Sequence, residues 1–145
     1  MNLSKLFLTI ISICLLTVLS ADAITRRPVY SDDYAHRLEL CGSYEEDYFY
    51  NINAPGTRLN LKTTESIIGI RGGKCATRSV IYLRTHPKPI GEIKCSLTEA
   101  QRKNLAAKIR LAKKSPREEL YYKQTYANYT HNPEICTFID YTEDD

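Results

Sequence analysis

The chain has 145 residues, of which 43% are hydrophobic and 26% are charged, and its formal net charge is +3 at pH 7. About 122 residues remain after a predicted leader, which is the size of one domain and enough for a hydrophobic core. These values exclude a multidomain protein, and no apolar run after the leader is long enough to span a membrane.

Residues 1–23 have the three parts of a secretory signal peptide. Lys5 gives a basic start, residues 6–19 form an apolar run, and Ala21 and Ala23 are the small residues of a cleavage site. The run of about 14 residues is shorter than the roughly 20 that a membrane-spanning helix needs. We therefore expect a secreted, extracellular protein with a single domain at residues 24–145, and a retained signal anchor is the alternative.

Four cysteines remain in the mature chain. They are Cys41, Cys75, Cys95 and Cys136. An even number in an exported chain indicates two disulfides, and the sequence does not choose among the three possible pairings. No C-x-x-C or H-x-x-x-H spacing occurs, so we expect neither a metal site nor a cofactor.

Charge is divided into three blocks along the chain. Residues 24–50 carry a net −3, residues 51–123 a net +11, and residues 124–145 a net −5. Such asymmetry suggests either an anionic partner or a pairing of the acidic ends with the basic middle. We expect residues 24–50 and 124–145 to form acidic, tyrosine-rich arms.

The elements in the middle of the chain predict an α+β fold with an antiparallel sheet of about four or five short strands. Period-two alternation, or a short apolar run, is found at residues 57–63, 66–70, 79–85, 90–95 and 135–140, the last at a sheet edge. Turn signals separate them at Pro55-Gly56, Gly72-Gly73 and Pro87-Lys88-Pro89.

One amphipathic helix is predicted at about residues 96–114. Ser96 and Glu99 have the spacing of a capping box, and Ser115-Pro116 suggests the end of the helix. An apolar stripe faces the sheet: Leu97, Leu105, Ile109 and Ala112. A basic stripe faces solvent: Arg102, Lys103, Arg110, Lys113 and Lys114. Lys108 lies nearer the apolar side, where its stem can snorkel.

The basic stripe is either a solvated helix face or an anion-binding surface. Outside the cell, such an anion is a sulfated glycan, an acidic lipid headgroup or an acidic protein. Membrane binding is not favoured, because the apolar stripe is narrow and has no Trp or Phe. Nucleic acid is not expected, because stacking aromatics are absent from this segment. Disulfide-linked strands followed by a basic amphipathic helix directly after Cys95 are similar in outline to chemokine-like ligands. The chain departs from their pattern in lacking a Cys-Cys or Cys-x-Cys pair near the mature N-terminus, and in continuing past the helix to Cys136. The resemblance concerns architecture and class.

Two modifications are predicted. Asn128-Tyr129-Thr130 is a glycosylation sequon on an expected exposed loop. Tyr44, Tyr48 and Tyr141 stand beside acidic residues and are sulfation candidates. In an alternative interpretation, residues 43–51 form an edge strand with Tyr48 and Tyr50 on its inner side and Phe49 on the other.

No catalytic motif is found, so we do not expect an enzyme. His36, His86 and His131 have no motif around them that links them, and no G-x-S-x-G elbow occurs. We predict a secreted interaction protein that binds an extracellular protein receptor or an anionic glycan. The alternatives are a hormone precursor cut at Arg26-Arg27 and Lys113-Lys114, and a small hydrolase such as a ribonuclease. The oligomeric state is left open.

Overall fold

A computed structural model describes residues 28–54 and 56–142. The predicted signal peptide therefore lies outside the described residues. In chain order the elements are α3 (Asp32–Leu40), β1 (Tyr44–Ala54), β2 (Thr57–Arg71), β3 (Lys74–Leu83), β4 (Pro89–Leu97), α4 (Glu99–Ala112), α5 (Pro116–Thr130) and β5 (Cys136–Asp140). No helix among these residues is long and apolar enough to cross a membrane.

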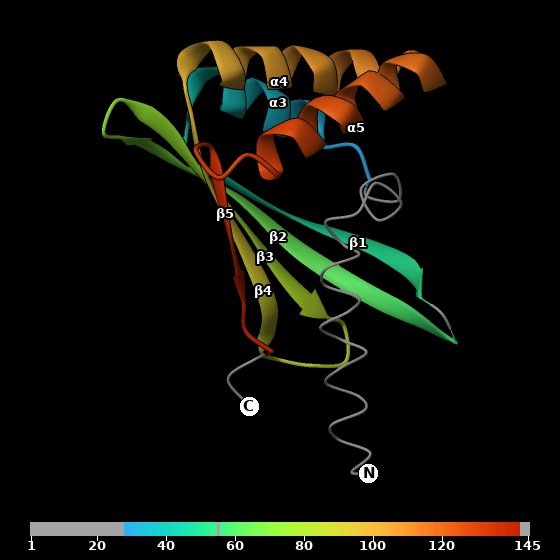
Figure 1. Cartoon of the computed structure of the whole chain (residues 1–145). Helices are drawn as coiled ribbons and strands as arrows, with labels where there is room; N and C mark the ends of the chain where they lie inside the picture. Colours follow the sequence, from blue (N-terminus) through green and yellow to red (C-terminus); the bar gives the residue numbers. More distant parts are fainter. Residues whose placement is uncertain (1–27, 55, 143–145) are drawn as a thin grey trace.

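The five strands form one antiparallel sheet in the sequential order β1-β2-β3-β4-β5 (Figure 1). This confirms the predicted α+β class and the edge position of the last strand. The strands are longer than expected, because β2 joins two predicted strands into one of 15 residues. Thr63 and Glu65 keep the period-two burial across the supposed gap, and no turn residue interrupts it.

The helices α3, α4 and α5 cover one face of the sheet at one of its ends (Figure 1). The predicted helix is α4, and its buried side carries Leu105, Ile109 and Ala112 as expected. The predicted first residue of this helix was wrong by three positions, because Ser96 and Leu97 are the last residues of β4, where Leu97 pairs with Cys75. The observed capping box uses Thr98 and Gln101 in place of Ser96 and Glu99.

The other two helices were not predicted. Ser31 caps α3, and two acids occupy its first turn. Ser115 caps α5 and Pro116 takes a position in its first turn, so the dipeptide expected to end one helix also begins the next. The stretches expected to be peripheral arms are instead α3 with β1, and the end of α5 with β5.

The buried residues form two clusters on the same face of the sheet. The first lies between the sheet and the helical layer and includes Leu38, Ile67 and Ile109. The second lies along the strands beyond the helices and includes Leu61 and Ile81.

Each disulfide joins two elements of the fold. Cys41, the C-cap of α3, bonds to Cys75 of β3 and fixes that helix to the sheet. Cys95 and Cys136 are directly opposite each other in β4 and β5. The predicted two disulfides are therefore confirmed, and the structure supplies the pairing.

Candidate functional site

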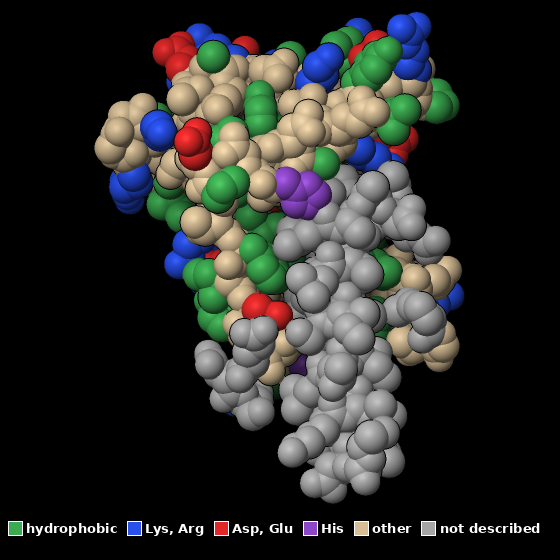
Figure 2. Space-filling model, in the orientation of Figure 1, with side chains coloured by type: hydrophobic (Ala, Val, Ile, Leu, Met, Phe, Trp, Pro, Cys, Tyr) green, Lys and Arg blue, Asp and Glu red, His purple; other side chains and the backbone are tan. Residues whose placement is uncertain are grey.

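The basic stripe of α4 meets acids from the N-terminal block. Arg110 donates a hydrogen bond to the carboxylate of Glu39 in α3, and Lys113 Nζ lies 3.1 Å from Asp32 Oδ1. The hydrogen bond from Arg110, with its charge, lowers the pKa of Glu39. Part of the acidic end of the chain thus folds onto the basic middle, and basic and acidic side chains lie interspersed along the helical layer (Figure 2).

Two other residues of the stripe, Lys103 and Arg102, have different surroundings. Lys103 forms an ion pair with Glu99 one turn earlier on α4. Arg102 is half-buried, and its Nη1 has no hydrogen-bond partner among the described residues. Ion pairs between exposed side chains contribute only about 0–1 kcal/mol. The ion pairs of Lys103 and Lys113 therefore add little stability, and the half-buried Arg102 has a buried Nη1 that does not face solvent.

A separate group of cations lies where α4 meets α5. We define the basic patch as Lys108, Lys114 and Arg117. Lys108 and Arg117 lie near Tyr121, and Lys114 lies in the connection between the two helices. Lys108 Nζ is 5.5 Å from the Tyr121 ring centroid, and Arg117 Cζ is 5.4 Å from it. Arg117 Nε also donates to the Tyr121 hydroxyl at 3.0 Å. None of the three cations forms an ion pair with another described residue.

Of the basic patch, only Lys114 was among the predicted anion-binding residues. Arg117 was missed because Ser115-Pro116 was interpreted as an end and not as a beginning. The signal that identifies it is the spacing of Arg117 and Tyr121, four residues apart on a helix that starts at Pro116.

Residues 43–51 belong to β1, where alternation separates the tyrosines from most of the acids. Tyr48 and Tyr50 are on the inner face of the sheet, the face that the helices partly cover, and the ring of Phe49 is on the outer face with Asp47. This confirms the edge-strand interpretation. Glu46 is the exception, because it is on the inner face, where its carboxylate accepts a hydrogen bond from the Ser31 hydroxyl at 2.5 Å.

Tyrosines fill much of the space between the sheet and the helices. Ring contacts link six of the eleven tyrosines of the chain: Tyr30, Tyr34, Tyr44, Tyr48, Tyr122 and Tyr126. Burial, with the charge of Glu65, raises the pKa of Tyr34 well above its ordinary value. The tyrosine content is therefore largely a property of the core and less a property of exposed arms.

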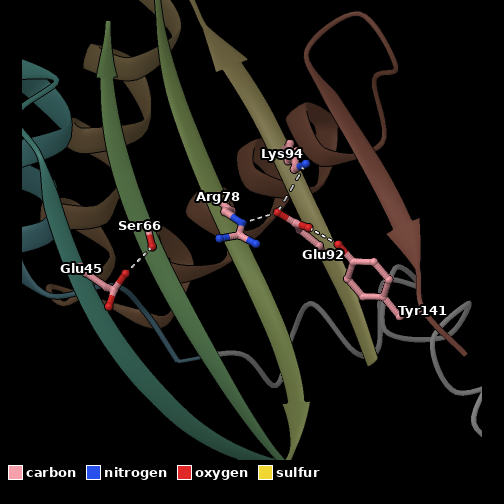
Figure 3. Close-up of polar contacts among 6 residues, drawn as sticks. All are labelled: Glu45, Ser66, Arg78, Glu92, Lys94 and Tyr141. Atoms are coloured by element: carbon pink, nitrogen blue, oxygen red, sulfur yellow. Dashed lines mark hydrogen bonds and ion pairs between the residues drawn. The ribbon is translucent and has the colours of Figure 1, made fainter. Parts of the chain in front are cut away.

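The sulfation candidates have different surroundings. Tyr44 is half-buried, and its ring centroid is 6.3 Å from that of Tyr34. The Tyr48 hydroxyl accepts a hydrogen bond from the Ser31 backbone N–H at 2.8 Å. The Tyr141 hydroxyl donates to the buried carboxylate of Glu92 (Figure 3). Sulfation stays a prediction, and in two of the three cases it would replace an existing hydrogen bond.

Asn128 is exposed, as expected, but it lies in the last turn of α5 and not in a loop. Thr130 of the sequon donates its hydroxyl to the carbonyl oxygen of Tyr126 at 3.0 Å. Glycosylation stays a prediction. The three histidines are exposed on separate elements, with His36 in α3, His86 after β3 and His131 at the C-cap of α5.

A small cavity lies between the sheet and the helical layer, and one of the side chains that line it is Glu65, a buried acid that was not among the predicted site residues. Glu65 lines it with Ser79 and Tyr34, and the Ser79 hydroxyl donates to Glu65 at 2.7 Å. Its volume of about 20 Å³ corresponds to about one water molecule.

The described residues contain no group of three or more His, Cys, Asp or Glu arranged to hold a metal ion. Comparisons with protein-family models, curated proteins and solved structures found no match to this chain.

Proposed function

We propose that the chain is a secreted, non-enzymatic interaction protein that binds an anionic partner through the basic patch of α4 and α5. The partner is an acidic receptor protein or a sulfated glycan. Two disulfides support an oxidising compartment, because such bonds persist there and not in the cytosol.

The observation that carries the proposal is the contrast between paired and unpaired cations in one layer. Arg110 and Lys113 are matched by acids of α3, whereas Lys108, Lys114 and Arg117 have no ion pair with a described residue. Arg117 is held by its contact with Tyr121, which orients its guanidinium. An oriented guanidinium matches carboxylate or sulfate oxygens through paired N–H donors.

The test is chromatography of the secreted protein on immobilised heparin. The wild type is expected to elute well above about 0.15 M salt, the physiological range in which exposed charges are already screened. The triple variant Lys108→Ser, Lys114→Ser, Arg117→Ser is expected to elute at markedly lower salt. Its control removes the same charge from exposed residues elsewhere: Arg58→Ser, Arg84→Ser and Lys88→Ser.

Elution of the wild type at or below physiological salt would contradict glycan binding. Equal shifts for the two triple variants would show that the net charge acts without a defined site. If the heparin column does not retain the wild type, a column of immobilised acidic peptide, used with the same variants, tests the protein-receptor form of the proposal.

One observation favours the precursor hypothesis as a second candidate. Lys113 and Lys114 are exposed in the short connection between α4 and α5, and are not inside the helix as predicted. Mass spectrometry of the secreted, reduced protein decides, since an uncut chain contradicts processing at this pair.

A further inference from the structure

The hairpin between β2 and β3 extends beyond the strands beside it (Figure 1). The pairing of β1 with β2 ends at Tyr44 and Ile67, and the chain before Tyr44 leaves the sheet towards α3. Residues 68–71 of β2 pair only with β3 among the described residues. We call residues 68–74 the hairpin finger. One edge of its β2 arm therefore has no neighbouring strand in the described part of the chain.

The finger displays large apolar side chains to solvent. Ile68 is 42% exposed and Ile70 is 51% exposed. Leu40, which is 63% exposed, precedes Cys41, and the partner of this cysteine, Cys75, is opposite Ile70. Three of the five large hydrophobic residues exposed in the described part of the chain are thus either in the finger or next to Cys41.

A bulge sets the direction of these side chains. The register between β2 and β3 shifts between Ile67 and Gly69, where Gly69 has φ +117°. Ile67 is opposite Thr77 and Ile70 is opposite Cys75, and residues two apart on β3 share a face. The bulge therefore brings Ile70 to the face of the buried Ile67, three residues away, and extends the apolar face of the sheet onto the finger.

The tip of the finger is basic. Arg71 and Lys74 flank the Gly72-Gly73 turn and are both exposed. The Arg71 Nη1 donates to the carbonyl oxygen of Ile70 at 3.1 Å, which places the guanidinium beside the backbone of β2. A shallow groove of about 360 Å³ runs next to this edge and is lined by Tyr44, Ile67 and Ile68, among others.

We propose that the open edge of the finger receives an extended acidic segment of a partner protein, which adds as a strand beside residues 68–71. Backbone hydrogen bonds provide affinity in this mode, and alternate side chains provide specificity. The partner's apolar side chains contact Ile68 and Ile70, and its carboxylates meet Arg71 and Lys74. This surface is distinct from the basic patch and does not depend on it.

The backbone groups on the edge of the finger favour a protein strand over a lipid bilayer as its binding partner. Inserting the finger into hydrocarbon would bury backbone N–H and C=O groups on the edge of β2 that has no neighbouring strand among the described residues, and each group left without a hydrogen bond costs several kcal/mol. An adding strand satisfies the same groups. The short length, the bulge and the two cations of this edge are also devices that limit uncontrolled pairing between copies of a chain.

The test uses a fluorescent hexapeptide of alternating glutamate and valine, with binding to the secreted protein measured by anisotropy. A matched peptide with proline in place of valine keeps the charge but removes backbone donors. Loss of two hydrogen bonds predicts about tenfold weaker binding of the proline peptide. The variants Ile70→Ser and Arg71→Ser with Lys74→Ser are expected to weaken the valine peptide by a similar factor.

Two controls define the site. Leu120→Ser removes an equally exposed apolar residue from α5, and the triple variant of the basic patch removes three cations; both are expected to bind the valine peptide as the wild type does. Circular dichroism confirms folding of every variant. Equal binding of the two peptides, or equal effects of Ile70→Ser and Leu120→Ser, would overturn the proposal. The proposal would also be overturned if the protein sedimented with anionic phospholipid vesicles and did not bind the peptide, since the finger would then be assigned to a membrane surface.

Discussion

Glu92 on β4 is a charged residue whose surroundings differ from those of a surface carboxylate. Its side chain is only 1% exposed, on the face of the sheet opposite the helices. Arg78 and Tyr141 both donate hydrogen bonds to it, and Lys94 Nζ lies 3.7 Å from Oε1 (Figure 3). Burial alone would raise the pKa of Glu92, but these hydrogen bonds and the nearby positive charges outweigh it and lower the pKa below its ordinary value.

The substitution Glu92→Gln is expected to lower the free energy of unfolding by about 1–3 kcal/mol at pH 7, the range for hydrogen bonds to charged groups. Because the folded pKa is lowered, the stabilisation is present above the unfolded pKa of about 4.3 and is lost as pH falls through the folded value. Urea unfolding from pH 7 to pH 3 should therefore show the wild type and the variant converging at the acid end.

Glu45→Gln is the matched control for this prediction. Glu45 is exposed on the same face and accepts a hydrogen bond only from Ser66 among its described contacts (Figure 3). Its substitution should change stability by less than about 0.5 kcal/mol, the usual range for surface positions. A constant difference between the wild type and Glu92→Gln across the pH range would contradict an electrostatic origin.

At this scale the sequence predicted the alternation of residues 43–51 but not the buried acids. Period two is a local property, so Tyr48, Tyr50 and Phe49 could be assigned to faces without the fold. The partners of Glu92 come from β3 and from beyond β5, up to 49 residues away. No local pattern reports such contacts.

Among the elements, the N-terminus of α4 provides the clearest test. Thr98 accepts a hydrogen bond from the Gln101 N–H, and the Gln101 side chain accepts one from the Thr98 N–H. Thr98→Ala is expected to cost about 1 kcal/mol of stability, as is usual for loss of a cap. Ser96→Ala is the control, because Ser96 lies in β4 and is not the cap. A larger loss for Ser96→Ala in urea unfolding would favour the capping box first predicted.

Helices were predicted well where the apolar residues are aliphatic and poorly where they are tyrosines. The buried stripe of α5 consists of Tyr122 and Tyr126, four residues apart. Tyrosine has a polar hydroxyl group, so its spacing does not stand out as an apolar period. In α3 the same role is shared by Tyr34, Ala35 and Leu38. The caps at Ser31 and Ser115 were the local signals present. Ser31 fell in a stretch interpreted as a peripheral arm, and Ser115 was interpreted as a helix end.

For the whole molecule, the disulfides close loops of similar length, with sequence separations of 34 and 41 residues. The chain-entropy model predicts a loss of about 4 kcal/mol for either one. We expect Cys41→Ser with Cys75→Ser, and Cys95→Ser with Cys136→Ser, to lower the unfolding free energy by comparable amounts.

Hydrogen exchange should separate the two double variants. Loss of the first disulfide frees α3 from the sheet, so exchange is expected to rise in α3. Loss of the second leaves β4 and β5 paired by backbone hydrogen bonds, so the increase should be confined to β5. The same pattern in both variants would show that the domain opens as one unit.

The pairing of Cys95 with Cys136 has a consequence for any protease that reaches the connection between the two C-terminal helices. A cut after Lys114 falls between the two cysteines, so both fragments stay covalently joined. Under non-reducing conditions the nicked protein would differ from the intact one by a single added water, and only reduction would release two pieces. The chain is thus built so that it can become a two-chain molecule without losing a strand of its sheet.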